Sequence, residues 1–362
     1  MGNPKIPLIH PDETIKNAMK KLNETAQKTL LVVDENKRLL GTVTDGDIRR
    51  FVLKYGHLEG KVKNVYNPNP ISLTEGRFTA EDVKNIFLEK KVELIPVTDE
   101  RGVVKGYISW NEFFKDSKGF QYLKFRGKLD VPVVIMAGGK GTRLKPFTKV
   151  FPKPLIPIGE KPMIEAIVDH FKNFGVKKFF VIINYKGYLI ETYFNGIERD
   201  YEVEFIREKE FLGTAGSLKL LEGKIKGDFI VSNCDILVNA DFTEVLDFHR
   251  RNEAFFTSVT AFQHYKIPYG VVKTKPNGFV EDIEEKPEYV FQINTGVYIL
   301  NDKVLNYIKP DEYLDMPILI KRLIEDGKKV LAYPVQQSQY VDFGQWDEYK
   351  KALKILEELW NV

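Results

Sequence analysis

The sequence VPVVIMAGGKGTRLKPFTKVFPKPLIPIGEKP, residues 131–162, passes from an apolar run into a glycine-rich loop and then into prolines and lysines. The loop matches neither phosphate-binding loop that runs directly into a helix. Position 144 is leucine where G-x-G-x-x-G needs glycine, and no G-x-x-x-x-G-K-[ST] is present. Four prolines between positions 146 and 157 also argue against a continuous helix. We therefore expect the loop to bind anions through its own backbone N–H groups and side chains.

Positive charge is concentrated in and after this loop. Residues 140–161 contain a single acid, Glu160, and the basic residues Lys140, Arg143, Lys145, Lys149, Lys153 and Lys161. A flexible turn with this charge suits a polyanion such as a triphosphate. Taken alone, the stretch is equally compatible with a tight turn that has a solvated basic face.

From residue 131 onward, short β-branched runs alternate with helical patterns. Regular alternation in the first half predicts a mostly parallel, doubly wound, Rossmann-like α/β sheet. Strands follow one another more closely in the second half, where a mixed sheet is expected. A helix is predicted over residues 163–175, where MIEAIVDHFKNFG ends in glycine. The expected strands lie in VPVVIM, KKFFVIINY, VEFIRE, DFIVSN, FTSVTAF, YGVVKT, NTGVYIL and KVLAYPV.

The whole chain has 362 residues, which is enough for two domains. Its net charge of +3 is too small to indicate a nucleic-acid surface. No run approaches the roughly 18 apolar residues of a membrane span, and residues 1–22 lack the apolar core of a signal peptide. The single cysteine, Cys234, excludes an internal disulfide and a cysteine-based zinc cage. We expect a cytoplasmic protein without a nucleic-acid or membrane partner.

Two segments of the N-terminal part repeat one another. Residues 29–50, TLLVVDENKRLLGTVTDGDIRR, and residues 93–114, ELIPVTDERGVVKGYISWNEFF, each contain a strand, an acidic turn and a second strand after glycine. Each copy then has a hydroxyl residue three positions before an acid. These residues are Thr44 and Asp47 in the first copy, and Ser109 and Glu112 in the second. The repeat resembles a tandem pair of CBS modules, an α+β domain spanning residues 1–118, followed by a linker at residues 119–130.

The CBS resemblance implies a regulatory adenine or guanine nucleotide. In that family the hydroxyl side chain donates to a phosphate and the acid accepts from ribose hydroxyls. A second interpretation is that Thr44 and Asp47 only cap the next helix and that the pair serves dimerisation. Glu112 stands where the family usually has aspartate, so the second nucleotide site is the weaker expectation. Because CBS pairs commonly dimerise, a homo-oligomer is expected.

The stretch AGGKGTRLKPFTKVFPKPLIPIGEKPMI is similar to the signature of the sugar-1-phosphate nucleotidylyltransferases, G-G-x-G-T-R-L-x-P-x-T-x-x-x-P-K-P-L. Further blocks of that family follow in order: LGTAGSL (212–218), SNCDIL (232–237), PYGVV (268–272), EEKP (284–287), INTGVYIL (293–300) and VDFGQWDEY (341–349). The resemblance covers residues 131–362. It implies a Rossmann-like catalytic domain of the GT-A type with a mixed sheet.

The reaction that this resemblance implies joins two anions. An oxygen of a sugar-1-phosphate attacks the α-phosphorus of a nucleoside triphosphate, and pyrophosphate leaves. A phosphate monoester is largely dianionic near neutrality because its second pKa is about 6, so the nucleophile needs no general base. Cations that relieve the repulsion between the substrates are needed instead.

Family motifs then imply roles for individual residues. Asp235 and Asp342 are the implied Mg²⁺ ligands, since carboxylate oxygens suit that ion. Arg143 and Lys153 are the implied catalytic residues, acting on the triphosphate and near its α-phosphorus. The implied nucleotide-binding residues are Ala137, Gly138, Gly139, Gly141, Thr142, Glu208, Gly213 and Thr214. Lys286 would hold the sugar phosphate, and the sugar pocket would include Gly270, Glu285, Asn294 and Thr295. Cys234 replaces the glycine of the family's Asn-Gly-Asp and has no basic neighbour that would make it a nucleophile.

Glu208 is the residue that bears on which nucleotide base is bound. Thymidylyl- and uridylyl-transferring relatives commonly have glutamine five residues before the glycine that is Gly213 here. A carboxylate only accepts hydrogen bonds, and guanine offers adjacent N1–H and N2–H donors. GTP is therefore the expected nucleotide and a hexose-1-phosphate the expected co-substrate. Glu210 would take this part if the loop register shifts.

Other features of the sequence bear on specificity. The block LGTAG resembles mannose-1-phosphate guanylyltransferases, and a CBS pair ahead of such a domain resembles glucosamine-1-phosphate guanylyltransferases. The sequence does not choose between sugars. A uridylyl- or thymidylyltransferase, and a non-catalytic subunit that senses nucleotide sugars, are the alternatives.

Overall fold

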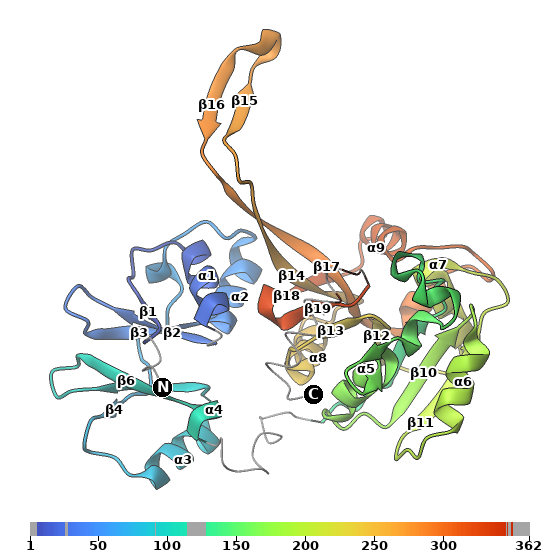
Figure 1. Ribbon diagram of the computed structural model, residues 1–362, viewed down its shortest axis with the longest axis horizontal. Helices are drawn as coiled ribbons and strands as arrows, with labels where there is room; N and C mark the ends of the chain where they lie inside the picture. Colours follow the sequence, from blue (N-terminus) through green and yellow to red (C-terminus); the bar gives the residue numbers. More distant parts are fainter. Residues whose placement is uncertain are drawn as a thin grey trace. The chain divides into compact units, whose positions relative to one another are not determined.

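The computed structural model describes residues 6–25, 28–90, 92–113, 128–344, 346 and 349, with backbone only at 88, 111 and 112. It divides the chain into two compact units, Met1–Phe125 and Arg126–Val362 (Figure 1). Residues 114–127, which contain most of the expected linker, lie outside the described residues, as do residues 350–362. Among the described helices, none is long and apolar enough to cross a membrane.

The N-terminal unit consists of two copies of one motif. The first copy contains β1 (Leu8–Ile9), α1 (Ile15–Thr25), β2 (Thr29–Val33), β3 (Leu39–Thr44) and α2 (Asp45–Tyr55). The second contains β4 (Leu73–Thr74), α3 (Ala80–Lys90), β5 (Leu94–Thr98), β6 (Val104–Ser109) and α4 (Trp110–Phe113). In each three-stranded sheet the central strand pairs parallel with the first and antiparallel with the third. The two copies share an apolar cluster that includes Leu31, Val33, Leu94 and Val104.

The second unit is built on a seven-stranded sheet of order β11-β10-β7-β12-β17-β14-β18. Its strands are β7 (Val133–Ala137), β10 (Lys178–Ile183), β11 (Glu202–Arg207), β12 (Asp228–Asn233), β14 (Phe256–Lys266), β17 (Glu288–Asn301) and β18 (Val330–Val335). β7, β10, β11 and β12 are parallel, whereas β17 runs antiparallel to both of its neighbours. The expected mixed sheet, parallel in its first half, is confirmed.

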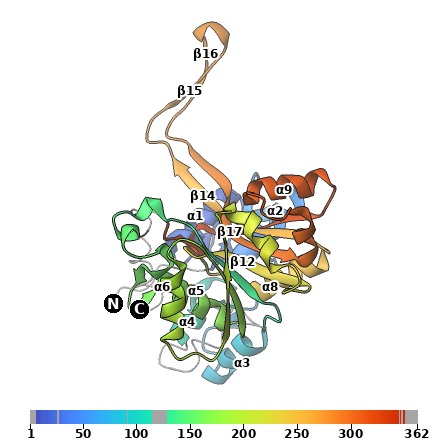
Figure 2. The same cartoon turned by 90° about the vertical axis from the view of Figure 1, so that its right-hand side faces the viewer.

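Helices cover both faces of this sheet (Figure 2). Side chains alternate along each strand, so that Val133 and Ile135 of β7 pack into one apolar cluster and Val134 packs into the other. The first cluster includes residues of α5 (Met163–Lys172), α6 (Gly187–Asn195) and α8 (Phe242–Arg251). The second includes residues of α7 (Gly213–Gly216) and α9 (Met316–Glu325). The core is therefore a three-layer α/β arrangement.

β14 and β17 continue beyond the sheet as a two-stranded ribbon. The ladder runs from Phe262↔Gln292 to Lys266↔Glu288, and Ile267 N donates to Pro287 O at 3.0 Å. A second hairpin, β15 (Val271–Thr274) and β16 (Val280–Glu284), extends the ribbon. We call residues 262–292 the arm; both views show it projecting from the sheet (Figures 1 and 2). The arm was not expected from the sequence. Only its β15 part was predicted as a strand, within YGVVKT, and the predicted strand NTGVYIL covers β17 only beyond the arm.

Candidate functional site

The glycine loop lies where the direction of strand order reverses. β7 lies between β10 and β12, and the loops after these parallel strands emerge at one edge of the sheet. Ligands of open α/β sheets bind in the crevice at such a switch point. Gly138 follows β7, Glu208 follows β11, and Asp235 lies two residues after β12. Residues from three separate parts of the sequence are thereby brought to one edge.

Glu208 lies directly against the glycine loop. A Cβ at Gly138 would collide with Oε2 of Glu208, so a larger residue there would displace the Glu208 carboxyl. The Glu208 side chain is held from the other side by Leu212 N, which donates to Oε1 at 3.3 Å. The residue is 5% exposed, and burial raises the pKa of its carboxyl above the ordinary 4.5. Glu210, the other candidate of this loop, is exposed.

Two carboxylates meet at the opposite end of the loop. β13 (Ile236–Val238) pairs antiparallel with β19 (Tyr340–Asp342), with Ile236 opposite Asp342. Phe343 N donates to Asp235 O at 2.9 Å, which fixes the two segments together. A Cβ at Gly344 would lie 2.5 Å from Asp235 Oδ2 and 2.8 Å from Asp342 Oδ1. Both side chains therefore face one small volume.

Lys153 completes this cluster. Its Nζ forms an ion pair with Asp235 Oδ2, and the two side chains are only 16% and 15% exposed. The same Nζ lies 3.1 Å from where a Cβ of Gly344 would be. Gly344 was not predicted as a site residue. The signal was available, because it lies two positions after Asp342 in the VDFGQWDEY block, but only the fold shows how tightly the groups are packed around it.

The donor set fits a hard divalent cation. Mg²⁺ prefers oxygen ligands and usually takes one or two protein carboxylates together with water and substrate phosphates. Asp235 and Asp342 supply two such carboxylates at one point. Within the described ranges, no group of three or more His, Cys, Asp or Glu side chains is placed to hold a metal. A protein-only cage, as for structural zinc, is therefore not formed by these residues.

The loop between the glycines and Lys153 is made of short 3-10 turns. Arg143 is exposed on the first, Thr142–Leu144. Gly141 has a left-handed φ of 60°, and a Cβ there would lie 2.8 Å from Cβ of Lys153. Lys186 Nζ donates to the carbonyl oxygens of Lys149 and Val150, at 2.5 and 2.9 Å. As the proline pattern predicts, no helix follows the glycines, and the loop folds back on Lys153.

The LGTAG block is held by a segment about 100 residues further along the chain. Gly213 has φ of 80°, and a Cβ there would lie 2.6 Å from Leu314 O. That oxygen accepts from Ala215 N at 2.8 Å and from Gly216 N at 3.0 Å. Asp315 Oδ1 accepts from Thr214 N at 3.2 Å. Gly213 and Thr214 thus lie in a rigid turn next to Leu212, the residue that contacts Glu208.

The predicted sugar residues fall into two groups. Asn294 and Thr295 lie in the sheet at a bulge of β17 and are held by sheet contacts. Thr295 Oγ1 donates to Val259 O at 2.7 Å, and Asn294 Nδ2 donates to Tyr298 Oη at 2.7 Å. Asn294 lies close to β12, because a Cβ at the neighbouring Gly296 would collide with the side chain of Asn233.

Gly270, Glu285 and Lys286 form the second group, on the arm. Glu285 Oε2 lies 3.1 Å from where a Cβ of Gly270 would be, so the two motifs PYGVV and EEKP do meet. Both charged side chains are exposed and form an ion pair of 3.7 Å. Lys286 lies eight residues before Asn294 on an extended ribbon, which places it roughly 25 Å from the sheet pocket at about 3.3 Å per residue. The structure does not bring this group to Asp235.

In the N-terminal unit, Thr44 and Asp47 form a capping box at the start of α2. Asp47 Oδ2 accepts from Thr44 N at 2.8 Å and from Thr44 Oγ1 at 2.7 Å, and Thr44 Oγ1 accepts from Asp47 N at 3.2 Å. Ser109 is buried at the end of β6. The side chain of Glu112 lies outside the described residues.

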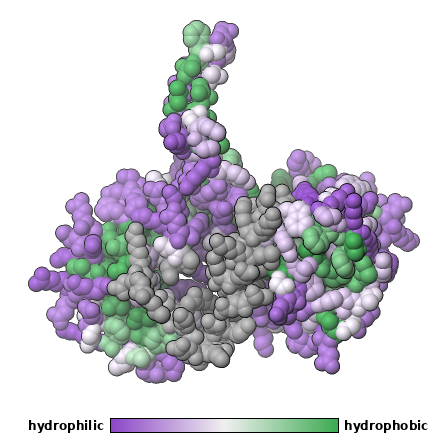
Figure 3. Space-filling view, in the orientation of Figure 1, coloured by the Kyte–Doolittle hydropathy of each residue, from purple (hydrophilic) through white to green (hydrophobic). Residues whose placement is uncertain are grey.

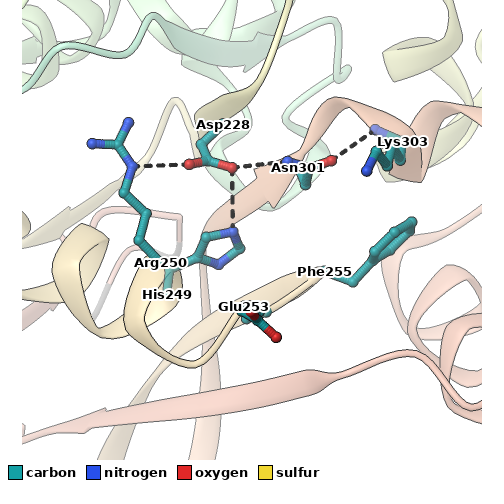
Figure 4. A pocket seen from close by; sticks show the side chains of 8 residues that line it. Asp228, His249, Arg250, Glu253, Phe255, Asn301 and Lys303 are labelled. Carbon is teal, nitrogen blue, oxygen red and sulfur yellow. Dashed lines mark hydrogen bonds and ion pairs between the residues drawn. The ribbon is translucent and has the colours of Figure 1, made fainter.

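A cavity of about 270 Å³ lies elsewhere in the second unit (Figure 4). It is at the opposite ends of the strands, since Asp228 begins β12 and Asn301 ends the antiparallel β17. Asp228 accepts from Arg250 Nε and Asn301 Nδ2, both at 3.0 Å, and pairs with the buried His249 at 3.6 Å. These contacts hold the pKa of Asp228 far below its usual range. The cluster joins α8 to the sheet and is not part of the site.

Comparison with known proteins identifies the fold. A family model described as nucleotidyl transferase matches residues 132–358, and a CBS domain model matches residues 2–54 and 62–118. The chain belongs to the nucleotidyl transferase family. Its N-terminal part is a tandem CBS pair, so both resemblances found in the sequence are confirmed.

Individual relatives of this nucleotidyl transferase carry several names. This chain is 39% identical over 185 residues to a mannose-1-phosphate guanyltransferase of Aspergillus oryzae, and the match covers 49% of this chain and 51% of that one. It is 31% identical over 251 residues to a UTP–glucose-1-phosphate uridylyltransferase of Synechocystis, covering 63% and 64%. The chain therefore spans about half to two thirds of the length of these relatives. The crystal structure of HddC from Yersinia pseudotuberculosis superposes with a TM-score of 0.50 and 27% identity, covering 62% of this chain and 98% of that one.

One residue, Cys234, departs from the family pattern, and the structure explains how it is accommodated. Cys234, which replaces the usual glycine before the first aspartate, is buried, and burial raises the pKa of its thiol to about 12. A thiol in that state is not nucleophilic near neutrality. It serves here as a small buried side chain.

Proposed function

We propose that this nucleotidyl transferase is a sugar-1-phosphate guanylyltransferase, which transfers GMP from GTP to a hexose-1-phosphate and releases pyrophosphate. The observation that carries the proposal is the meeting of Lys153, Asp235 and Asp342 at the mouth of the glycine loop. A lysine and two carboxylates at a sheet switch point suit phosphoryl chemistry in which positioning and charge do the work.

In the proposed reaction, the glycine loop Ala137–Gly141 and Thr142 wrap the triphosphate with backbone N–H groups. Lys153 leaves Asp235 and contacts the phosphates near the α-phosphorus. Arg143, exposed on the loop, neutralises charge on the β- and γ-phosphates. A sugar-phosphate oxygen forms a bond to the α-phosphorus, the bond from that phosphorus to the β-bridging oxygen breaks, and the electron pair leaves with pyrophosphate. No residue has to remove a proton, because the nucleophile is already an anion.

Asp235 and Asp342 are the residues proposed to hold Mg²⁺. When bound, such an ion neutralises phosphate charge and lowers the barrier by several kcal/mol. Asp235 also orients Lys153, since it is the ion-pair partner of this lysine within the chain.

Guanine is the proposed base because of Glu208. Its buried carboxylate lies beside Gly138, next to the loop that would hold the nucleotide, and has only acceptor atoms when ionised. Guanine presents two adjacent donors, N1–H and N2–H, whereas uracil presents a single N–H between two acceptors. The name of the Aspergillus relative is in line with this choice, and that of the Synechocystis relative with the alternative.

Further parts of the proposal concern the sugar and the N-terminal unit. Lys286 is proposed to hold the sugar phosphate, with Gly270, Glu285, Asn294 and Thr295 lining the sugar pocket. We propose a regulatory adenine or guanine nucleotide for the CBS pair, at Thr44 and Asp47 and, in the second copy, at Ser109 and Glu112. A cytoplasmic homo-oligomer is proposed for the whole molecule.

The test is pyrophosphate release from GTP, UTP, dTTP, ATP and CTP, each paired with a panel of hexose-1-phosphates including amino sugars. We expect GTP to be preferred. A preference for UTP or dTTP would overturn the guanine assignment while leaving the family reaction intact. Tight nucleotide-sugar binding in calorimetry with no turnover of any pair would instead indicate a sensing subunit.

A further inference from the structure

Asn184, which no sequence motif selected, lies between the glycine loop and Glu208. It follows β10, the strand that lies between β7 and β11 in the sheet. On the side of the glycine loop, Tyr185 N donates to Gly138 O at 3.4 Å. On the other side, Glu208 N donates to Ile183 O at 3.0 Å. The backbone on both sides of Asn184 is therefore hydrogen-bonded to the two segments that would hold the nucleotide.

The side chains of Asn184 and Glu208 converge on Gly138. A Cβ at Gly138 would collide with Oε2 of Glu208 and would lie 3.3 Å from Cβ of Asn184. Glu208 is buried, whereas Asn184 is only half-buried. Burial raises the pKa of the Glu208 carboxyl, and hydrogen bonds from Leu212 N and the Asn184 side chain oppose this rise. A hydrogen bond that lowers a carboxyl pKa is one donated to the carboxylate, so the NH2 group of the Asn184 amide faces Glu208.

The segment that carries Asn184 is also tied to the basic loop. Lys186 Nζ donates to Lys149 O at 2.5 Å and to Val150 O at 2.9 Å. These contacts fix the position of the Asn184 side chain before any substrate binds. The arm, along which Figure 3 shows hydrophobic residues, contains neither Asn184 nor Glu208, so the pair belongs to the sheet itself.

We propose that Asn184 is a second base-recognition residue, which donates a hydrogen bond to O6 of guanine while Glu208 accepts from N1–H and N2–H. The inference rests on the proposed function and adds the residue that recognises the 6-oxo group. Along this edge guanine presents an acceptor, a donor and a second donor in order. The NH2 group of Asn184 and the two carboxylate oxygens of Glu208 present a donor, an acceptor and a second acceptor, which is the complementary order.

The same two side chains disfavour the other bases. Uracil and thymine have a carbonyl oxygen on each side of their single N–H, so one oxygen of Glu208 would face another acceptor. Adenine and cytosine have an amino group next to an acceptor nitrogen. Their amino group would face the NH2 group of Asn184, and their ring nitrogen would face the carboxylate of Glu208. Selection of guanine therefore combines matched contacts with repulsion of the alternatives.

The experiment compares three nucleotides in the wild-type chain, Asn184→Ala and Glu208→Gln, with kcat/KM from pyrophosphate release at one fixed hexose-1-phosphate. The nucleotides are GTP, 6-thio-GTP, whose sulfur is a weaker acceptor than O6, and ITP, which lacks the N2 amino group. We expect Asn184→Ala to lower kcat/KM for GTP by about tenfold, corresponding to the loss of one hydrogen bond. The loss with 6-thio-GTP should be much smaller, so the preference for GTP over 6-thio-GTP falls toward one. The preference for GTP over ITP should remain, because Glu208 still accepts from N2–H.

Glu208→Gln should give the reverse pattern, with a reduced preference for GTP over ITP and a retained preference for GTP over 6-thio-GTP. If Asn184 only positions Glu208, Asn184→Ala will give the Glu208→Gln pattern, and that result overturns the proposal. An unchanged preference for GTP over 6-thio-GTP in Asn184→Ala overturns it as well. Asn184→Leu, which keeps the size of the side chain without its donor, replaces Asn184→Ala should the latter fail to fold.

Asn252→Ala is the matched control. It removes an exposed amide that donates to Phe248 O at 2.8 Å at the end of α8, and it is expected to change neither preference. A wild-type chain that turns over no nucleotide, or that prefers UTP or dTTP to GTP, would overturn the proposed function itself. Failure of the Asn184 proposal alone appears instead as a wild-type chain that prefers GTP and an Asn184→Ala chain with unchanged preferences.

Discussion

At the scale of single residues, Asp235 is the group on which the proposed chemistry depends most. It pairs with Lys153 and faces the same volume as Asp342. We expect Asp235→Ala to lower kcat by about 100-fold or more, since charge stabilisation of this kind supplies several kcal/mol. Steady-state pyrophosphate release measures it. Glu222→Gln, which removes an exposed carboxylate paired with Lys219, is the matched control and should be neutral. A loss of less than tenfold in Asp235→Ala would contradict the metal assignment.

Glu208 gives a prediction that depends on pH. Burial raises the pKa of its carboxyl above 4.5, so protonation on acidification begins at a higher pH than for an exposed glutamate. The protonated form loses an acceptor, and the KM for GTP is expected to rise as the pH falls through this raised pKa. The measurement is KM for GTP against pH, with pyrophosphate release as the readout.

Glu208→Gln is the control for that titration. A neutral amide is expected to remove the pH dependence and to reduce the preference for GTP over UTP by about tenfold, corresponding to roughly one hydrogen bond to a charged group. An unchanged pH profile in Glu208→Gln would show that another group titrates.

At the scale of elements, the turn that begins α7 depends on Gly213. Its φ of 80° is left-handed, and a Cβ would lie 2.6 Å from Leu314 O. We expect Gly213→Ala to destabilise the fold by about 1–3 kcal/mol and to raise the KM for GTP, because the turn has to move. Gly223→Ala is the control, since its φ of 77° is similar but nothing lies within 4 Å of its Cβ position. The free energy of unfolding in denaturant and the KM for GTP are measured for both variants. Because both positions have a left-handed φ, equal losses in the two variants would show that contact with Leu314 is not the cause.

The joint between α8 and the sheet is the second element to test. Asp228 accepts hydrogen bonds from Arg250 and Asn301 and pairs with buried His249, and its pKa is strongly lowered. A lowered carboxyl pKa contributes stability above the unfolded value, near 3.8, and this stability is lost as the pH falls below it. Asp228→Asn should therefore cost about 2 kcal/mol at pH 7 and somewhat less at pH 3, because the pKa in the folded state lies well below that pH and the remaining stabilisation is lost only on further acidification. Urea unfolding at both pH values measures it. A penalty that does not change with pH would show that the charge of Asp228 is not involved.

Most strands of the second unit could be predicted from the sequence, because their apolar runs are local signals. DFIVSN is β12 without any shift, and VPVVIM and KKFFVIINY contain most of β7 and β10. β13 and β19, each of three residues, were missed because they exist only through their pairing with one another. The early start of β17 at Glu288 was missed for a similar reason. EYVFQI has no regular alternation, and its extended form depends on the ladder with β14.

At the scale of the whole molecule, the CBS pair offers a test of regulation. Thr44–Asp47 at α2 and Thr79–Asp82 at α3 form capping boxes with nearly the same distances. Only the first lies at the predicted nucleotide position. We expect Thr44→Ala and Thr79→Ala to destabilise the chain equally, by about 1 kcal/mol. Only Thr44→Ala should weaken the response of the rate to adenine or guanine nucleotides, measured by titration at fixed GTP. Equal responses in both variants would indicate a purely structural cap.

The candidate site was predictable residue by residue but not as an arrangement. Motif spacing selected Asp235, Asp342 and Lys153. The two aspartates are 107 residues apart in the sequence, and only the pairing of β13 with β19 brings them together. The VDFGQWDEY block contains Gly344, but only the folded structure shows that this glycine leaves the space into which Asp235, Asp342 and Lys153 point. The distance between Lys286 and the cluster also depends on tertiary structure, because it follows from the unbroken ribbon and not from the EEKP motif.

The ion pair between Lys153 and Asp235 has a consequence for the resting protein. An empty site with two converging aspartates would repel itself, and the lysine acts as a built-in counterion until substrate arrives. In the proposed reaction the same ammonium group moves from carboxylate to phosphate, so the two aspartates lose this counterion when the nucleotide binds. Removal of Lys153 would harm the unliganded fold as well as the reaction, and the thermal stability of such a variant would recover only in part when nucleotide binds. In the proposed mechanism, Lys153 first neutralises a carboxylate and then contacts the substrate.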